Sequence, residues 1–258
     1  NSKRSNRLQV LNIISFIGVI VVNGLANLLP INGYQTGEVS ELYPNLFTPA
    51  GITFSIWGII YLTLVGFVLY QARGLISKKE PPLDLLKRIG YLFAISCLAN
   101  IGWLIAWHYL KIKLALLIML VLLGSLAAIY RRLDIGKRAV SRKENWFVHL
   151  PFSLYTAWIT VATLANLTVV LVDLNWYGTL IPAELWTVGM ILLAVGAAVY
   201  MYTTRGDLYY NLVIIWALLG IIIKRVVIAE QLVASVVLAA GLGSLVIVGN
   251  IIYQKLKR

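Results

Sequence analysis

The sequence alternates between long apolar runs and short polar links. Eight runs stand out, at about residues 8–30, 52–72, 88–109, 113–130, 147–172, 184–203, 208–225 and 231–253. A spanning helix needs about 20 mostly apolar residues, because a hydrocarbon core of roughly 30 Å is crossed at about 1.5 Å per residue. The runs are continuously apolar, which excludes the short alternating strands of a membrane β-barrel. The pattern predicts an all-α integral membrane protein, a bundle of about eight transmembrane helices, with residues 1–258 forming a single membrane domain.

Composition and charge agree with a membrane protein and exclude other classes. With 60% hydrophobic and only 12% charged residues, and a mean hydropathy of +0.85, the chain cannot be an ordinary soluble domain. The net charge of +12 does not indicate nucleic-acid binding, because the Lys and Arg residues lie in the links beside the apolar runs. The expected partners are therefore membrane lipids and no nucleic acid.

The distribution of positive residues predicts the orientation. Of the 22 Lys and Arg residues, all but four fall in the tails and links on one side, above all in two basic loops near 73–88 and 131–146. Positive residues are retained on the cytoplasmic side. We therefore expect both termini in the cytoplasm of a protein integral to the cell (plasma) membrane, which requires an even number of spans. The first run is too long for a signal peptide and should stay as a span.

Three spans carry Trp, Tyr and Asn among their apolar residues. In the third span Asn100, Trp103 and Trp107 fall on nearly one helix face, since residues three or four apart are neighbours there. The second and fifth spans carry similar ladders, formed by Phe54, Trp57 and Tyr61 and by Tyr155, Trp158 and Ala162. Belts of Trp and Tyr at the membrane surface are the simpler explanation for many such rings. Rings well inside a span instead favour a site that sandwiches a flat ligand.

Two further features leave alternatives open. Leu-Ala-Asn occurs at 25–27, 98–100 and 164–166, which places Asn27, Asn100 and Asn166 at membrane depth. These amides either hydrogen-bond between helices or face a ligand. The first outside loop, residues 31–51, contains the turn signal Asn32-Gly33 and no Lys or Arg. It is either a lid over an outward-facing pocket or an ordinary exposed loop.

The aromatic spans resemble the tryptophan-rich sensory protein family, also called the translocator protein or TspO/MBR family. The family's second helix opens with a Pro-rich turn followed by Phe and Trp-x-x-x-Tyr, its third carries Asn-x-x-Trp, and its fifth reads roughly Tyr-x-Ala-Trp followed by Ala-Thr and Asn. The matching positions here are Pro49-Ala50-Gly51, Phe54, Trp57, Tyr61, Asn100, Trp103, Trp107, Tyr155, Ala157, Trp158, Ala162, Thr163 and Asn166. The chain departs from the pattern at Leu154 and Ile52, and one residue is missing between Gly51 and Trp57. The resemblance covers about residues 8–175, and the last three spans, 184–253, lie beyond it.

The resemblance implies a five-helix pocket, capped by the first loop, for a hydrophobic or aromatic ligand such as a porphyrin or a sterol-like molecule, with a sensory or carrier role. No cofactor is required, and a porphyrin or haem-like group would be the ligand. Rings would stack on it, Asn100 would anchor its polar edge, and Ala162 would permit close approach. The residues implied as pocket lining are Pro49, Phe54, Trp57, Asn100, Trp103, Trp107, Tyr155, Trp158 and Ala162.

Other functions are less well supported by the residues. An enzyme is not expected, because no acid lies mid-span and because His108 and His149 sit near opposite span ends without metal-ligand spacing. Weak tetrapyrrole degradation is implied only by the resemblance. A secondary transporter would need broken helices at mid-membrane, and the seven Pro residues all lie near span ends. A scaffold without ligand is the third alternative. Small residues in the sixth and eighth spans either stabilise the bundle or form a homodimer seam.

Overall fold

The structure is a computed structural model that describes residues 2–29, 31–76, 83–228 and 232–257, without the side chains of residues 2–4 and 76. Lys78, Lys79 and Arg258, which contribute to the expected charge asymmetry, lie outside the described residues. Throughout the described ranges the regular structure is helical, which confirms the predicted fold class. The helices are α1 (Ser2–Leu28), α2 (Thr36–Glu41), the 3-10 helix η1 (Gly51–Ser55), α3 (Ile56–Gln71), α4 (Arg73–Ile76), α5 (Leu83–Ile89), α6 (Leu92–His108), α7 (Ile112–Arg132), α8 (Arg142–Glu144), the π-helix η2 (Asn145–His149), α9 (Leu150–Asp173), α10 (Ala183–Arg205), α11 (Leu208–Ile223), the π-helix η3 (Lys224–Ile228) and α12 (Ala234–Leu256).

The number of spans agrees with the sequence. Within the described residues seven helical segments are long and apolar enough to cross a membrane, and the pair α5 and α6 makes an eighth if it is counted as one span. The expected third span, 88–109, corresponds to α6 with the last residues of α5, and the two helices are bent by 50° at the start of that span. The bend follows from Gly90, whose φ of +56° lies in the left-handed region that ends helices and that other residues avoid.

The chain divides into two compact units, which are described separately. Unit 1 comprises residues 1–36 and 57–156, and unit 2 comprises residues 37–56 and 157–258. The divisions fall in the first loop, at the start of α3 and within α9. In unit 1, α6 packs against α7 and α1, and α5 packs against α1 and α7. Its interior holds four interlocking, buried rings, those of Phe16, Phe67, Phe93 and Phe152.

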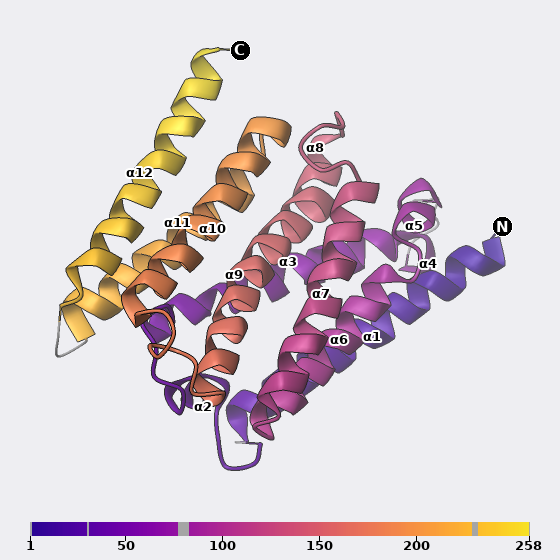
Figure 1. The fold of residues 1–258 in the computed structure, drawn as a ribbon. Coiled ribbons are helices and arrows are strands. Elements are labelled where there is room, and N and C mark those ends of the chain that lie inside the picture. The colour runs from indigo at the N-terminus through magenta and orange to yellow at the C-terminus, as the bar shows by residue number, and fades with distance from the viewer. Residues whose placement is uncertain (1, 30, 77–82, 229–231, 258) are drawn as a thin grey trace. The chain divides into compact units, whose positions relative to one another are not determined.

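In unit 2, α10, α11 and α12 pack pairwise against one another (Figure 1). The small residues expected to mediate close packing do so in part. Gly243 of α12 faces α10 so closely that a Cβ there would lie 2.7 Å from Val195 Cγ2, and Ala198 and Ala240 are buried. A Cβ at Gly189, Gly196 or Gly241 would meet no atom within 4 Å, so close packing does not explain these glycines.

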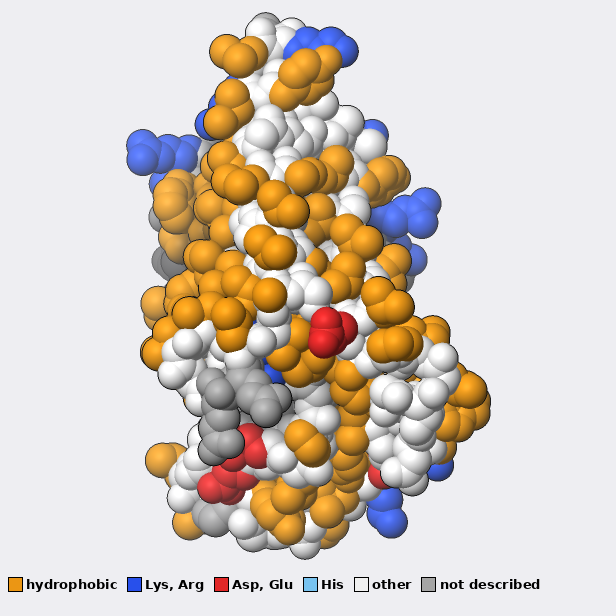
Figure 2. Space-filling view, turned by 60° about the vertical axis from the view of Figure 1, so that its left-hand side comes forward, with side chains coloured by type: hydrophobic (Ala, Val, Ile, Leu, Met, Phe, Trp, Pro, Cys, Tyr) orange, Lys and Arg blue, Asp and Glu red, His pale blue; other side chains and the backbone are white. Residues whose placement is uncertain are grey.

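The surface is that of a protein in lipid. Figure 2 shows hydrophobic side chains over most of the visible face, and large residues such as Leu62, Leu185 and Leu245 are exposed. So much exposed apolar surface far exceeds what a soluble monomer carries. Opposite charges meet at one place in unit 1, where Asp84 contacts Arg88 and Arg138 and where Glu144 contacts Arg138.

Candidate functional site

A ladder of near-parallel rings forms in unit 1. Trp57 of α3 stacks on Tyr61, with ring centroids 5.3 Å apart and an interplanar angle of 21°. Trp57 also stacks on Trp103 of α6 at 6.3 Å and 27°, and Trp103 stacks on Trp107 at 5.9 Å and 24°. The ring of Tyr155 from α9 meets Trp57 edge-on at 6.0 Å. Three helices thus supply one continuous aromatic surface. Its rings stack on one another.

A chain of hydrogen bonds runs alongside these rings. The Tyr61 hydroxyl donates to Asn23 Oδ1 (2.8 Å), Asn23 Nδ2 donates to Asn100 Oδ1 (2.9 Å), and Asn100 Nδ2 donates to the Tyr155 hydroxyl (2.9 Å). Four helices, α1, α3, α6 and α9, are joined by this chain. Asn100 is fully buried, so its amide needs these partners.

The three Leu-Ala-Asn amides therefore differ. Asn100 hydrogen-bonds between helices, as one of the two alternatives expected. Asn27 Nδ2 donates to Asn23 O within α1, and Asn166 Nδ2 donates to Ala162 O within α9. Asn27 lies on the exposed face of α1. The repeated tripeptide does not mark a repeated structural role.

The remaining residues implied by the resemblance lie in unit 2. Phe54 belongs to η1, and its ring meets that of Trp158 edge-on, with centroids 5.9 Å apart. Pro49 is buried and Ala162 is half-buried. The structure thus brings together Trp57, Asn100, Trp103, Trp107 and Tyr155 in unit 1, and the contact of Phe54 with Trp158 in unit 2.

The Pro49 turn is fixed by contacts that the sequence pattern does not indicate. Asn45 Oδ1 accepts hydrogen bonds from the backbone N–H groups of Phe47 (3.0 Å) and Thr48 (2.8 Å), which shapes the approach to Pro49. Beyond the turn, the Ala50 N–H donates to Gly220 O of α11 (3.0 Å).

Gly220 lets η1 lie against α11. A Cβ on Gly220 would clash with the buried Thr53 side chain, whose own Cβ would be 2.9 Å away. The indole N–H of Trp216 in α11 donates to Thr53 O (2.9 Å), which also ties η1 to α11.

The first loop is anchored rather than freely exposed. In unit 1, Thr36 Oγ1 lies 3.0 Å from His108 Nε2, Asn32 Nδ2 donates to His108 O (3.1 Å), and the Trp107 indole N–H donates to Thr36 O (3.0 Å). In unit 2, the Leu46 N–H donates to the Tyr177 hydroxyl (2.9 Å). Both His108 and His149 are buried. His108 holds the start of the loop, a role that its position at a span end did not reveal.

Side chains that could together hold a metal ion do not gather in the described part of the chain. No cluster of three or more His, Cys, Asp or Glu residues occurs there. Cys97 is a free thiol buried in α6. The chemistry that the site offers is stacking on indole rings and hydrogen bonding from amide, phenol and indole groups.

Comparison with known protein families shows where the chain belongs. The sequence model of a family described as TSPO-like protein matches residues 9–253, and so extends through the last three spans. Neither the curated proteins nor the solved structures contain a match. Because the family match covers nearly all of the sequence, the chain belongs to the TSPO-like protein family.

Proposed function

We propose that this TSPO-like membrane protein binds a flat hydrophobic ligand, such as a porphyrin or a sterol-like molecule, among the rings of Trp57, Trp103, Trp107 and Tyr155, and that it acts as a sensor or carrier. The observation that supports the proposal is the near-parallel ladder, with ring centroids 5.3 to 6.3 Å apart. A flat ligand that parts two stacked rings keeps a face-to-face contact with each, so insertion exchanges one stacking contact for two.

The polar groups beside the ladder would orient the ligand. Tyr61, Asn100 and Tyr155 hold amide and phenol groups beside the same aromatic surface, where they now bond with one another and with Asn23. A few fixed polar groups in an otherwise apolar site are the usual arrangement for small-molecule recognition. The proposal assigns no bond-making or bond-breaking step to these residues.

The test is quenching of tryptophan fluorescence by protoporphyrin IX in the detergent-purified protein. With eight Trp residues in the chain, the loss of one leaves enough reporters. We expect saturable quenching in the wild type and a roughly tenfold or greater loss of affinity, about 1.4 kcal/mol, in Trp57→Leu and Trp103→Leu. Trp158→Leu tests separately whether the ring of unit 2 contributes.

The matched control is Trp176→Leu, because Trp176 is 57% exposed and lies outside the ladder. It should bind like the wild type. Unsaturable quenching, or equal affinity in Trp103→Leu and Trp176→Leu, would reject the proposed site and leave a scaffold without ligand as the better description.

The bend between α5 and α6 is the feature that would favour a secondary transporter instead. Transporters bind substrate where helices are broken near mid-membrane. Here the bend at Gly90 lies beside basic residues, since Arg88 donates to Arg132 O (3.2 Å) and Arg132 donates to Arg88 O (3.4 Å). Paired cations belong near a membrane surface, so the bend does not resemble a mid-membrane site.

We also propose that both termini face the cytoplasm of a protein in the plasma membrane, which the charge asymmetry supports. Single cysteines in a Cys97→Ser background test this with a membrane-impermeant maleimide on intact cells. Gly37→Cys, in the first loop, should react at once, whereas Ala139→Cys, in the basic loop, should react only after lysis. The reverse order would invert the topology.

A further inference from the structure

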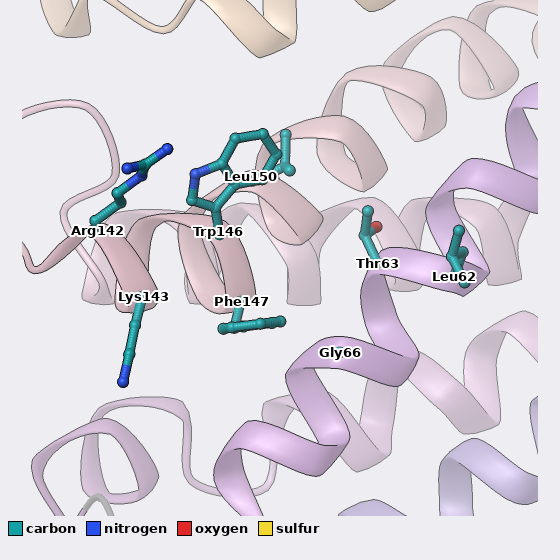
Figure 3. Close-up of a pocket in the computed structure, with 8 residues that line it drawn as sticks. All are labelled: Leu62, Thr63, Gly66, Arg142, Lys143, Trp146, Phe147 and Leu150. Atoms are coloured by element: carbon teal, nitrogen blue, oxygen red, sulfur yellow. The ribbon is translucent and has the colours of Figure 1, made fainter.

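A groove on unit 1 lies apart from the aromatic ladder. It runs between α3 and the segment formed by α8, η2 and the start of α9, and its volume is about 600 Å³ (Figure 3). From α3 it is lined by Leu62, Thr63 and Gly66, and from the other wall by Trp146, Phe147 and Leu150. A volume of this size accommodates a small molecule or part of a lipid.

The wall formed by Phe147 is held in place. A Cβ on Gly66 would lie 3.0 Å from Phe147 Cδ1, so the glycine permits the ring to sit against α3. The Tyr70 ring stacks on Phe147 at 5.9 Å and 18°, and the Arg73 guanidinium lies 4.5 Å from the Tyr70 ring centroid. These contacts hold the Phe147 ring in one position, so the groove has a defined shape.

Two cations stand at one end of the groove. Arg142 and Lys143 also line it, and Figure 3 shows Arg142 on the side of Trp146, with Lys143 on the side of Phe147. The nearby acids are engaged elsewhere, because Arg138 contacts both Asp84 (3.4 Å) and Glu144 (3.6 Å). Among the described residues, neither Arg142 nor Lys143 forms an ion pair.

The same wall as Phe147 also carries Trp146, a residue typical of the membrane surface. Trp146 is 50% exposed, and Trp residues favour the boundary between headgroups and acyl chains, where one edge of the indole is wet. The π-helical turn η2, closed by the bond from the Leu150 N–H to Asn145 O, carries both Trp146 and Phe147. Such turns are rare and often occur at functional sites.

We propose that the groove binds an anionic phospholipid, with the phosphate held by Arg142, the charge of Lys143 adding to the attraction, and one acyl chain lying along Leu62, Thr63 and Phe147. The charge complementarity is specific, since a guanidinium offers paired donors to a phosphate, and basic pockets between spans on the basic side of a membrane protein suit such headgroups. A zwitterionic lipid would fill the groove but bring its own cation toward Arg142. A free phosphate would leave the apolar walls without contact.

The test is native mass spectrometry of the full chain in detergent, titrated with phosphatidylglycerol or with phosphatidylcholine of the same acyl chains. The wild type should bind the first phosphatidylglycerol at least roughly tenfold more tightly than phosphatidylcholine. The double variant Arg142→Gln/Lys143→Gln should bring the two lipids within about threefold of each other. Thr63→Trp, which fills the groove from α3, should weaken both lipids by roughly tenfold.

Two matched controls separate the site from general effects. Arg131→Gln/Lys137→Gln removes two exposed charges from the same loop without touching the groove, and Leu69→Trp adds an indole to an exposed position of α3 outside it. Both should bind like the wild type. If the control pair loses the lipid preference as fully as the groove pair, the attraction is diffuse and the proposal fails. It fails equally if wild type shows no preference, or if Thr63→Trp binds like Leu69→Trp.

Discussion

Two aromatic clusters lie in unit 1, and α3, α6 and α9 contribute rings to both. In the phenylalanine cluster, the Phe67 ring lies 4.9 Å from Phe93 at 66° and 4.9 Å from Phe152 at 73°. In the ladder, Trp57, Tyr61, Trp103 and Trp107 stack at 21° to 27°. The rings of Phe67, Phe93 and Phe152 thus meet edge-to-face, with Phe16 tilted at 36° on Phe93, whereas the ladder is near-parallel.

This difference in ring geometry indicates which of the two clusters can admit a flat ligand. Edge-to-face rings interlock, so a flat molecule finds no parallel faces to separate, and phenyl rings carry no donor at their edges. Near-parallel rings can be parted without losing stacking, and the ladder carries donors at its edges, since the Tyr61 hydroxyl donates to Asn23 Oδ1 and the Trp107 indole donates to Thr36 O. The phenylalanine cluster is a core, whereas the ladder has the geometry of a binding surface.

Phe93→Ala should have the largest effect on stability, and it tests whether the phenylalanine cluster is a core separate from the ladder. Phe93 is fully buried among three other rings, and its removal leaves a cavity that should cost about 3 kcal/mol of unfolding free energy. Porphyrin affinity of the folded fraction should stay within about twofold of the wild type, less than 0.5 kcal/mol. Unfolding in mixed micelles and fluorescence quenching measure the two quantities.

The control for this prediction is Phe147→Ala, at a ring that is 42% exposed. It should cost less than about 1 kcal/mol, since little cavity forms at a surface position. If Phe93→Ala instead abolished porphyrin binding while the protein stayed folded, the two clusters would form one site and the contrast would be wrong.

An intermediate effect is expected from Asn100→Leu. This change removes the bonds to Asn23 and to the buried Tyr155 hydroxyl, and it should cost about 2 kcal/mol of unfolding free energy, although Asn23 Nδ2 keeps its bond to Val19 O. The same change at the exposed Asn27, which bonds within α1, should cost less than about 0.5 kcal/mol. Equal losses at the two positions would show that Asn100 does not link helices energetically. Unfolding in mixed micelles again provides the measurement.

Much of the fold could be predicted from the sequence, because span length and composition determine it directly. Each apolar run of about 20 residues must be a helix in lipid, where every backbone polar group needs an internal partner. The bend at Gly90 could not be predicted, since a glycine in an apolar run is compatible with a straight helix or a broken one. The sequence also could not predict which glycines of α10 and α12 contact a neighbouring helix. Apolar periodicity does not identify the packed face when every face of a helix is hydrophobic.

The candidate site could be predicted only in part. Helical spacing placed Trp103 and Trp107 on one face, and the structure stacks them. The partners from other helices, above all Asn23, are set by tertiary packing, which one helix's sequence does not encode. The phenylalanine cluster gave no signal, because Phe in an apolar run is as compatible with lipid contact as with burial. The role of His108 in holding the first loop could not be predicted, since its partners Ile31 and Thr36 are distant in sequence.

The smallest expected effect comes from Trp107→Phe, which keeps a ring for stacking on Trp103 but removes the N–H that bonds Thr36 O (3.0 Å). Losing one hydrogen bond should cost about 1 kcal/mol, equivalent to a roughly fivefold rise in local opening. Hydrogen exchange of residues 31–41 should therefore accelerate by about that factor while porphyrin affinity changes little. Trp146→Phe, at an exposed ring, is the control and should leave exchange there unchanged. Slower porphyrin release in Trp107→Phe would contradict a lid role for the loop, because a loosened lid must release a ligand faster.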